Sequence, residues 1–146
     1  MKQDPFRIIN GQKYDRVTAV LDRFPAPEIV KWQLRVGKDE AKRVKTLALK
    51  VGSRVDELIK EHILSGKIKL KKTDLIEVRN CIEWYLQWRR EWPTIDFRQT
   101  DQLLIDDKLF VSGTLDATIM FMEQINYQGL MIKAGSTAVL DFKCSG

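Results

Sequence analysis

The fold is decided by two runs of sequence, Gly113-Thr-Leu-Asp-Ala-Thr-Ile-Met-Phe121 and Ala138-Val-Leu-Asp-Phe-Lys143. Both runs alternate apolar and polar side chains, which indicates β-strands that are buried on one face only. The expected apolar faces consist of Leu115, Ala117, Ile119 and Phe121 in the first run and Ala138, Leu140 and Phe142 in the second. The two runs therefore predict neighbouring strands of one sheet, with an apolar face for the core and a polar face opposite it.

The polar face carries acidic side chains on both strands. Asp116 lies there with Thr114 and Thr118, and Asp141 shares this face with Lys143. Two carboxylates that are brought together repel each other, and a divalent cation such as Mg²⁺ or Mn²⁺ relieves the repulsion because it prefers oxygen ligands. A lysine beside such an ion can balance the charge of a reacting phosphate. The residues alone leave a second interpretation open, in which this is the solvated outer face of an exposed strand.

The remaining sequence predicts a helical first part and a sheet at the end. A β-hairpin is expected at the start, and it turns at Asn10-Gly11. Helical spacing covers 17–24, 28–36, 39–49 and 53–64, with a break at Gly52-Ser53 and Ser53 as a cap, and a long helix extends from Thr73 or Asp74 to Trp92. Strands are expected at 94–105, 109–122 and 137–143. Helices followed by a three-stranded sheet indicate the α/β class, without a doubly wound topology.

Length and composition predict one ordinary globular domain. The 146 residues are divided into a hairpin and short helix at 1–26, a basic helical part at 27–92 and the strands at 93–146. The sequence has no apolar run of about 18 residues, and its start lacks the apolar core of a signal peptide. We therefore expect a cytoplasmic protein with no membrane partner. Cys81 and Cys144 lack a CxxC spacing and are expected to be free thiols.

The net charge of +5 is unevenly distributed. Between Lys31 and Lys72 there are thirteen Lys or Arg and five Asp or Glu, whereas the rest of the chain has an acidic excess. A basic segment of this kind favours a polyanionic partner. The candidate phosphate contacts are Lys42, Arg43, Lys45, Lys50, Lys67, Lys69, Lys71 and Lys72. The alternative is a solvated helix surface that is rich in lysine.

Several motifs, taken in their order along the chain, resemble those of RecB-like nucleases of the PD-(D/E)XK superfamily. Gly113-Thr-Leu-Asp116, followed by Val139-Leu-Asp-Phe-Lys143-Cys-Ser, resembles the family's G-[TI]-x-D and [VI]-[LI]-D-[FW]-K-[TS]-S pair. Upstream, Arg16-Val-Thr-Ala-Val-Leu-Asp22 and Trp32 resemble the opening of phage and bacterial members. Gly52-Ser-Arg-Val-Asp-Glu-Leu-Ile59 resembles their G-T-x-[VI]-H-x-x-[IL] helix. The ordered set covers most of the chain and is more specific than any single motif.

The resemblance implies a restriction-endonuclease-like core and a Mg²⁺- or Mn²⁺-dependent nuclease that hydrolyses phosphodiester bonds of single- or double-stranded DNA. It points to an exonuclease of recombination, repair or phage DNA processing. The implied metal ligands are Asp116, Asp141, Asp56, which stands where the family has a histidine, and the carbonyl group of Phe142. The implied catalytic residues are Lys143, Asp141 and Asp116.

The family continues into a helix with a Q-x-x-x-Y motif and a further strand, and this sequence has neither. We therefore expect the natural chain to extend past Gly146 with a covering helix, or a second copy of the chain to supply the cover. Asp101 is an auxiliary candidate for the site, and His62 is expected on the surface. An apolar stripe on the long helix is expected to be core and not a base-stacking surface; it comprises Val78, Cys81, Trp84, Tyr85, Trp88 and Trp92.

Two other functions remain open. The same fold can serve as a non-catalytic module that binds nucleic acid or assembles with other proteins, and metal-dependent cleavage separates this function from a nuclease. The chain can also be a structural subunit that binds a protein partner, in which case its affinity for DNA shows no steep dependence on salt.

Overall fold

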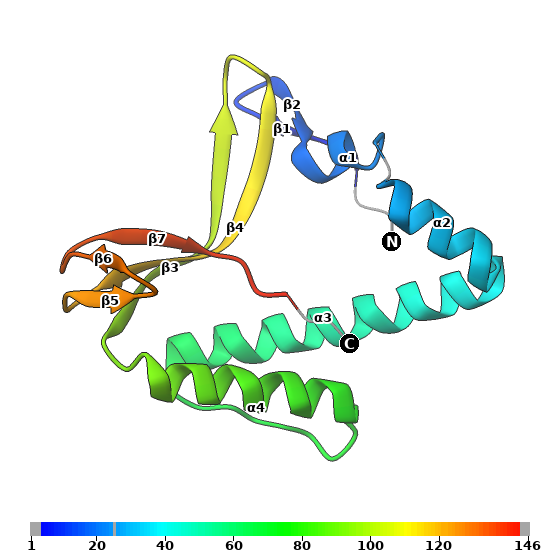
Figure 1. The fold of residues 1–146 in the computed structure, drawn as a ribbon. Coiled ribbons are helices and arrows are strands. Elements are labelled where there is room, and N and C mark those ends of the chain that lie inside the picture. Colours follow the sequence, from blue (N-terminus) through cyan, green and yellow to red (C-terminus); the bar gives the residue numbers. More distant parts are fainter. Residues whose placement is uncertain (1–3, 25, 144–146) are drawn as a thin grey trace.

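A computed structural model describes residues 4–24 and 26–143, in which helices and strands combine into a mixed α/β fold (Figure 1). The strands are β1 (Phe6–Ile9), β2 (Gln12–Arg16), β3 (Ile95–Asp106), β4 (Val111–Phe121), β5 (Ile125–Tyr127), β6 (Leu130–Ile132) and β7 (Thr137–Leu140). The helices are α1 (Val17–Leu21), α2 (Pro27–Val36), α3 (Lys38–Ser65) and α4 (Ile76–Glu91). The predicted α/β class is therefore confirmed.

Strand β4 is the centre of the main sheet. It pairs with β3 in antiparallel orientation along its whole length. Its other edge is shared, because β2 pairs in parallel with Val111 and Ser112, whereas β7 pairs antiparallel from Ala117 to Met120. The three predicted strands are thus neighbours, and the parallel partner that makes the sheet mixed is the N-terminal hairpin. The sequence pattern predicted this hairpin but not its place in the sheet.

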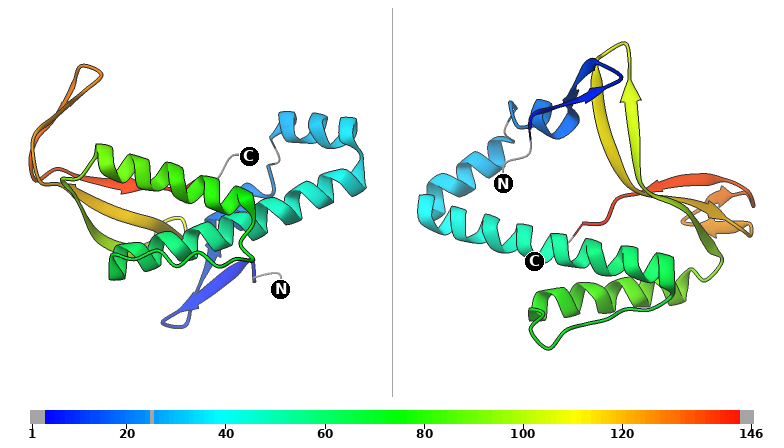
Figure 2. Two further views of the ribbon diagram at one scale, coloured as in Figure 1. Left: turned by 90° about the horizontal axis from the view of Figure 1, so that it is seen from below. Right: turned by 180° about the vertical axis from the view of Figure 1, so that it is seen from behind.

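Helices α3 and α4 lie together beneath β7 and the lower half of the β3–β4 hairpin, whose upper half rises away from them (Figures 1 and 2). One core lies between the two helices and contains Val55, Leu58 and Ile82, which are at most 2% exposed. A second core is formed by Ile95, Ile119 and Phe121 from the sheet, against which Trp88 and Trp92 pack. The predicted apolar stripe of α4 is therefore mostly core, with one exception: Trp84 is 71% exposed.

Helix α3 corrects the prediction of two helices that are separated at Gly52-Ser53. The helix continues through both residues, and Ser53 caps nothing. The physical reason is tertiary: Val51, Val55 and Leu58 belong to one buried stripe, and packing along this stripe outweighs the cost of about 1 kcal/mol for an interior glycine. Apart from its neighbours in sequence and the backbone of α3 itself, no atom lies within 4 Å of the position that a Cβ of Gly52 would occupy.

The start of α4 corrects a second prediction. Neither Thr73 nor Asp74 caps the helix; its N-cap is Leu75, which forms no side-chain capping bond. Asp74 instead accepts hydrogen bonds from the guanidinium group of Arg54 at 2.9 and 3.1 Å and from the backbone N–H of Lys71 at 2.7 Å. These bonds lower the pKa of Asp74 to about 2. The carboxylate therefore holds the connection between α3 and α4 to the middle of α3.

The end of the sheet contains two further differences from the prediction. The third strand ends at Leu140, so Asp141, Phe142 and Lys143 follow it in an extended but unpaired segment. The polar stretch before it contains the β5–β6 hairpin, which was not predicted because its strands have only three residues each. Cys81 is a free thiol, as expected, and Cys144 lies outside the described residues. No helix in the described part of the chain is both long and apolar enough to cross a membrane.

Candidate active site

Three aspartates lie side by side on β3, β4 and the segment that follows β7. Ala117 on β4 pairs with Leu140, the last residue of β7. Because the two strands are antiparallel, the residue before Ala117 and the residue after Leu140, Asp116 and Asp141, lie beside each other. On the other edge of β4, Thr100 pairs with Ala117 and Gln102 pairs with Leu115, which places Asp101 opposite Asp116. Neighbouring strands are about 5 Å apart. Asp101, Asp116 and Asp141 therefore form a row of carboxylates across the sheet, here called the carboxylate row.

Asp116 is the central and least exposed member of the carboxylate row. Its Oδ2 accepts a hydrogen bond of 2.7 Å from the backbone N–H of Phe142, which fixes its orientation toward the end of β7. Burial raises the pKa of Asp116, and the neighbouring charges of Asp141 and Asp56 raise it further. The raised pKa means that Asp116 gains from a proton or another positive charge at its oxygen atoms.

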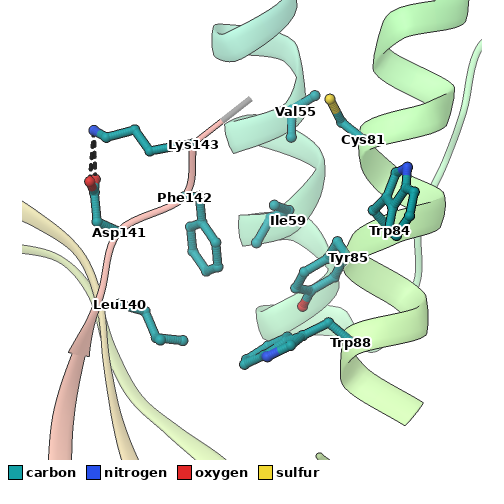
Figure 3. A pocket seen from close by; sticks show the side chains of 10 residues that line it. All are labelled: Val55, Ile59, Cys81, Trp84, Tyr85, Trp88, Leu140, Asp141, Phe142 and Lys143. Atoms are coloured by element: carbon teal, nitrogen blue, oxygen red, sulfur yellow. Dashed lines mark hydrogen bonds and ion pairs between the residues drawn. The ribbon is translucent and has the colours of Figure 1, made fainter. Parts of the chain in front are cut away.

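The three residues after β7 divide between two sides of the chain (Figure 3). Asp141 and Lys143 point away from the helices and form an ion pair of 2.7 Å. Phe142 points toward α3 and α4 and meets Tyr85 edge-on at 6.2 Å between ring centres. The predicted alternation is thus confirmed beyond the end of the strand. Lys143 lowers the pKa of Asp141, whereas the pKa of Asp116 is raised. Of the two neighbouring carboxylates, Asp141 is therefore the ionised one and Asp116 the one that favours a proton.

Lys60 on α3 joins two further carboxylates to the site. Its Nζ donates hydrogen bonds of 2.6 Å to Asp56, one turn earlier on the helix, and 2.6 Å to Asp101 on β3. The pKa of Lys60 is raised because the hydrogen bonds and charges of the two aspartates outweigh its burial. Asp101 has a left-handed backbone with φ of 54°, a conformation that aspartate tolerates better than most residues. Lys60 was not among the predicted site residues, although its four-residue spacing from Asp56 was visible in the sequence.

The donor set suits a small, hard cation bound through few protein ligands. Among residues 4–24 and 26–143, no three Asp, Glu, His or Cys side chains stand together as a ready-made metal site. Mg²⁺ commonly uses one or two carboxylates and keeps several waters. Asp116 and Asp141 meet this smaller requirement, and the pKa of Asp116 is raised by burial first and by the neighbouring Asp141 second. Asp56 is near enough to raise the pKa of Asp116, but its carboxylate accepts a hydrogen bond from Lys60. The carbonyl group of Phe142 stays a predicted ligand.

A cavity of about 590 Å³ adjoins the end of β7 on the helical side (Figure 3). Its walls combine the aromatic side chains of Trp84, Tyr85, Trp88 and Phe142 with Asp141 and Lys143. The cavity therefore adjoins the candidate site, whose charged side chains point to the opposite side of this segment. His62 lies near it, hydrogen-bonded through Nδ1 to the Tyr85 hydroxyl at 2.9 Å. This half-buried histidine corrects its predicted surface position, and burial lowers its pKa.

The predicted phosphate contacts are exposed but lie apart from the carboxylate row. The segment from Lys67 to Lys72, here called the basic connection, runs along the helical layer on the side opposite β7 (Figures 1 and 2). Lys69 pairs with Glu61 at 3.4 Å, and Arg43 on α3 pairs with Glu40 at 2.7 Å, so part of this charge is already neutralised. Lys42, Lys67, Lys71 and Lys72 are exposed, and their role in binding stays a prediction.

No protein-family model matches the chain, and neither a curated protein nor a solved structure is similar to it. The resemblance of its motifs to RecB-like nucleases therefore stays a hypothesis, which the geometry of the carboxylates and lysines has to support on its own.

Proposed function

We propose that this protein is a metal-dependent nuclease that hydrolyses phosphodiester bonds of nucleic acid, with Asp116, Asp141 and Lys143 as its catalytic residues. The observation that carries the proposal is that Asp116 lies beside Asp141, one position past the last pair of β4 with β7, with the Lys143 ammonium 2.7 Å from Asp141. The two carboxylates are adjacent, and the pKa of Asp116 is raised. A divalent cation stabilises such a pair because its charge offsets the repulsion between the carboxylates. We also propose that the fold is of the restriction-endonuclease-like type.

Each side chain has a distinct task in the proposed reaction. Asp116 and Asp141 would hold Mg²⁺ or Mn²⁺, which would neutralise charge on the phosphate. Water adds to phosphorus, the P–O bond to the leaving sugar oxygen breaks, and that oxygen takes up the proton that the water releases. Lys143, which is 79% exposed at its side chain, can turn from Asp141 toward a bound phosphate. Phe142 anchors the segment in the helical layer, so that Asp141 and Lys143 keep their positions on the opposite side. DNA as the substrate and exonuclease action follow from the resemblance of the motifs.

A cleavage assay tests this proposal. End-labelled single- and double-stranded DNA is incubated with the protein in Mg²⁺, Mn²⁺ or EDTA under single-turnover conditions. We expect cleavage with either metal and none in EDTA. Lys143→Ala should bind DNA as the parent does but cleave about 100-fold or more slowly, because it removes charge stabilisation in the transition state. Cleavage by Lys143→Ala at the rate of the parent would contradict the assigned role.

A non-catalytic nucleic-acid-binding module is the second candidate, and one observation favours it. Lys60 already pairs with Asp56 and Asp101, and Lys143 pairs with Asp141, so three of the four carboxylates have a positive partner without any metal. A site neutralised in this way can be purely structural. DNA binding that depends on salt, without cleavage in either metal, would support this candidate.

A further inference from the structure

A second cavity, of about 830 Å³, lies between the N-terminal hairpin, α1 and the upper half of the β3–β4 hairpin. Its donor side chains come from two separate parts of the sequence, and it is here called the Arg16 cavity. Arg7 and Arg16 contribute from β1 and β2, and Ser112 and Thr114 contribute from β4. The cavity is distinct from the aromatic one beside Lys143, and none of these four residues belongs to the proposed catalytic set.

Sheet register explains why these four side chains converge. Arg16 and Ser112 are partners in the parallel pairing of β2 with β4, so their side chains project to the same face of the sheet. Thr114 lies two residues further along β4 and shares that face. Arg7 pairs with Tyr14, two residues before Arg16, and its Nη2 donates a hydrogen bond of 2.9 Å to the Thr114 hydroxyl.

Two polar atoms of the Arg16 cavity are buried without a partner. Ser112 is only 2% exposed, and neither its Oγ nor the Nε of Arg16 has a hydrogen-bond partner among the described residues. A buried polar atom without a partner is unfavourable by about 1–3 kcal/mol, so native proteins rarely keep one without a reason. The guanidinium N–H can only donate, and therefore the missing partner must be a hydrogen-bond acceptor.

The acidic residues of the cavity wall do not supply that acceptor. The Oδ1 of Asp101 accepts from Lys60 at 2.6 Å, and the Oδ1 of Asp106 accepts from the backbone N–H groups of Lys108 and Leu109 at 2.8 and 3.0 Å. Asp15, beside Arg16 in sequence, faces Arg23 at 3.7 Å. No acidic side chain therefore pairs with the Nε of Arg16, and a negatively charged group with several oxygen atoms is the ligand that suits the arginine and hydroxyl side chains of this wall.

We infer that the Arg16 cavity binds a phosphate group of the nucleic-acid strand, next to the phosphate that lies at the carboxylate row. Thr114 and Asp116 lie on the same face of β4, two residues and therefore about 7 Å apart along the strand. A strand bound across this face meets both groups in succession. The inference rests on the proposed function for the identity of the ligand, while the need for an oxygen-rich anion follows from the cavity itself.

Binding experiments in EDTA test this site without requiring cleavage. Affinity of the full chain for a short labelled oligonucleotide is measured by fluorescence anisotropy over a range of salt concentrations. Arg16→Gln should weaken binding about tenfold or more and reduce the log–log salt slope by about 0.7 for a single strand. Arg23→Gln is the matched control, because it removes the same charge from an exposed residue outside the cavity. Equal effects of the two variants would overturn the inference.

Two further variants keep the test decisive if Arg16→Gln folds poorly. Arg16→Lys retains the charge but removes the buried Nε–H, and it should also weaken binding. Ser112→Ala should weaken binding several-fold while raising the melting temperature of the free protein, because it removes a buried hydroxyl that lacks a partner. A Ser112→Ala protein that binds as tightly as the parent would assign Ser112 a structural role and contradict the site.

The source of the phosphate is tested with two kinds of probe. Inorganic phosphate in EDTA should raise the melting temperature of the parent and of Arg23→Gln, but not of Arg16→Gln. Oligonucleotides with a 5′-phosphate, a 3′-phosphate or no terminal phosphate are then compared. A preference for one terminal phosphate that Arg16→Gln abolishes assigns the cavity to a strand end, and equally weakened binding of all three assigns it to an internal phosphate. Absence of cleavage alone, with these binding results intact, would refute the proposed function and not the phosphate site.

Discussion

Asp116→Asn is the substitution that most directly perturbs the charge balance of the carboxylate row. The change keeps the shape of the side chain, and its amide oxygen can still accept the 2.7 Å hydrogen bond from the Phe142 N–H. It removes one of two negative charges that lie side by side, one position past the last pair of β4 with β7. Like charges in such positions destabilise a sheet by up to about 1 kcal/mol. In metal-free buffer at pH 7, Asp116→Asn should therefore be more stable than the parent by about 0.5–1 kcal/mol, or about 2–3 °C in melting temperature.

The gain should depend on pH in a defined direction. The pKa of Asp116 in the folded protein is raised above its ordinary value of 3.8, so its stabilising contribution is fully present below pH 3.8 and is lost as pH rises through the folded pKa. The parent therefore carries the penalty at neutral pH and not in acid. The difference between Asp116→Asn and the parent should vanish near pH 4.

Divalent metal should reverse the order of stability. At a Mn²⁺ concentration ten times its dissociation constant, the parent should gain about 1.4 kcal/mol by mass action, whereas Asp116→Asn should gain much less. Thermal unfolding followed by circular dichroism, at pH 4 and 7 and in EDTA or Mn²⁺, measures all four conditions. Asp96→Asn is the control, since Asp96 is a partly exposed aspartate of the same sheet that pairs with Arg98 outside the carboxylate row. An Asp116→Asn protein that is less stable than the parent in EDTA at pH 7, or equally stabilised by Mn²⁺, would refute the reasoning.

Three further predictions concern the helical layer. Gly52→Ala should raise the melting temperature by about 3 °C in thermal unfolding, because an interior helical glycine costs about 1 kcal/mol relative to alanine and no atom beyond its sequence neighbours and the backbone of α3 lies within 4 Å of the new Cβ; a drop in stability would contradict the continuous helix. Asp74→Asn should lower the melting temperature by several degrees at pH 7, and the difference should shrink as pH falls from 3.8 toward the lowered pKa of about 2, because only the ionised carboxylate pairs fully with Arg54. Replacing the four lysines of the basic connection by Gln should lower the salt slope of DNA binding by up to about one unit for each phosphate that these lysines neutralise; an unchanged slope would assign them to a solvated surface.

Alternation of side chains predicted much of the site because the sheet enforces it. The alternation in β4 correctly separated Ala117 and Ile119, which are at most 1% exposed, from Asp116 on the other face. The same pattern placed Phe142 on the apolar side and Asp141 with Lys143 on the polar side, even though the paired strand ends at Leu140. A period of two persists in any extended chain, so the facing of these side chains was predictable without the strand boundary.

Contacts between distant elements were not predictable from local pattern. Lys60 joins α3 to β3 through Asp101, and a contact across forty-one positions leaves no periodic signal. Arg54 draws Asp74 away from the helix terminus, so a residue with the properties of an N-cap forms an ion pair instead. The local sequence at Gly52 predicts a helix break, but the buried residues before and after it keep the helix continuous. In each case tertiary packing or charge pairing outweighs a local preference of about 1 kcal/mol.

The central claim is that Asp116 and Asp141 together hold a divalent ion, and calorimetric titration with Mn²⁺ measures this most directly. The parent and the Asp96→Asn control should each bind one Mn²⁺ per chain at the site, with the same affinity. Asp141→Asn should abolish this binding, because it removes the ionised partner of Asp116 from the end of β7. If Asp141→Asn binds Mn²⁺ with the affinity and stoichiometry of the parent, the assigned site is wrong.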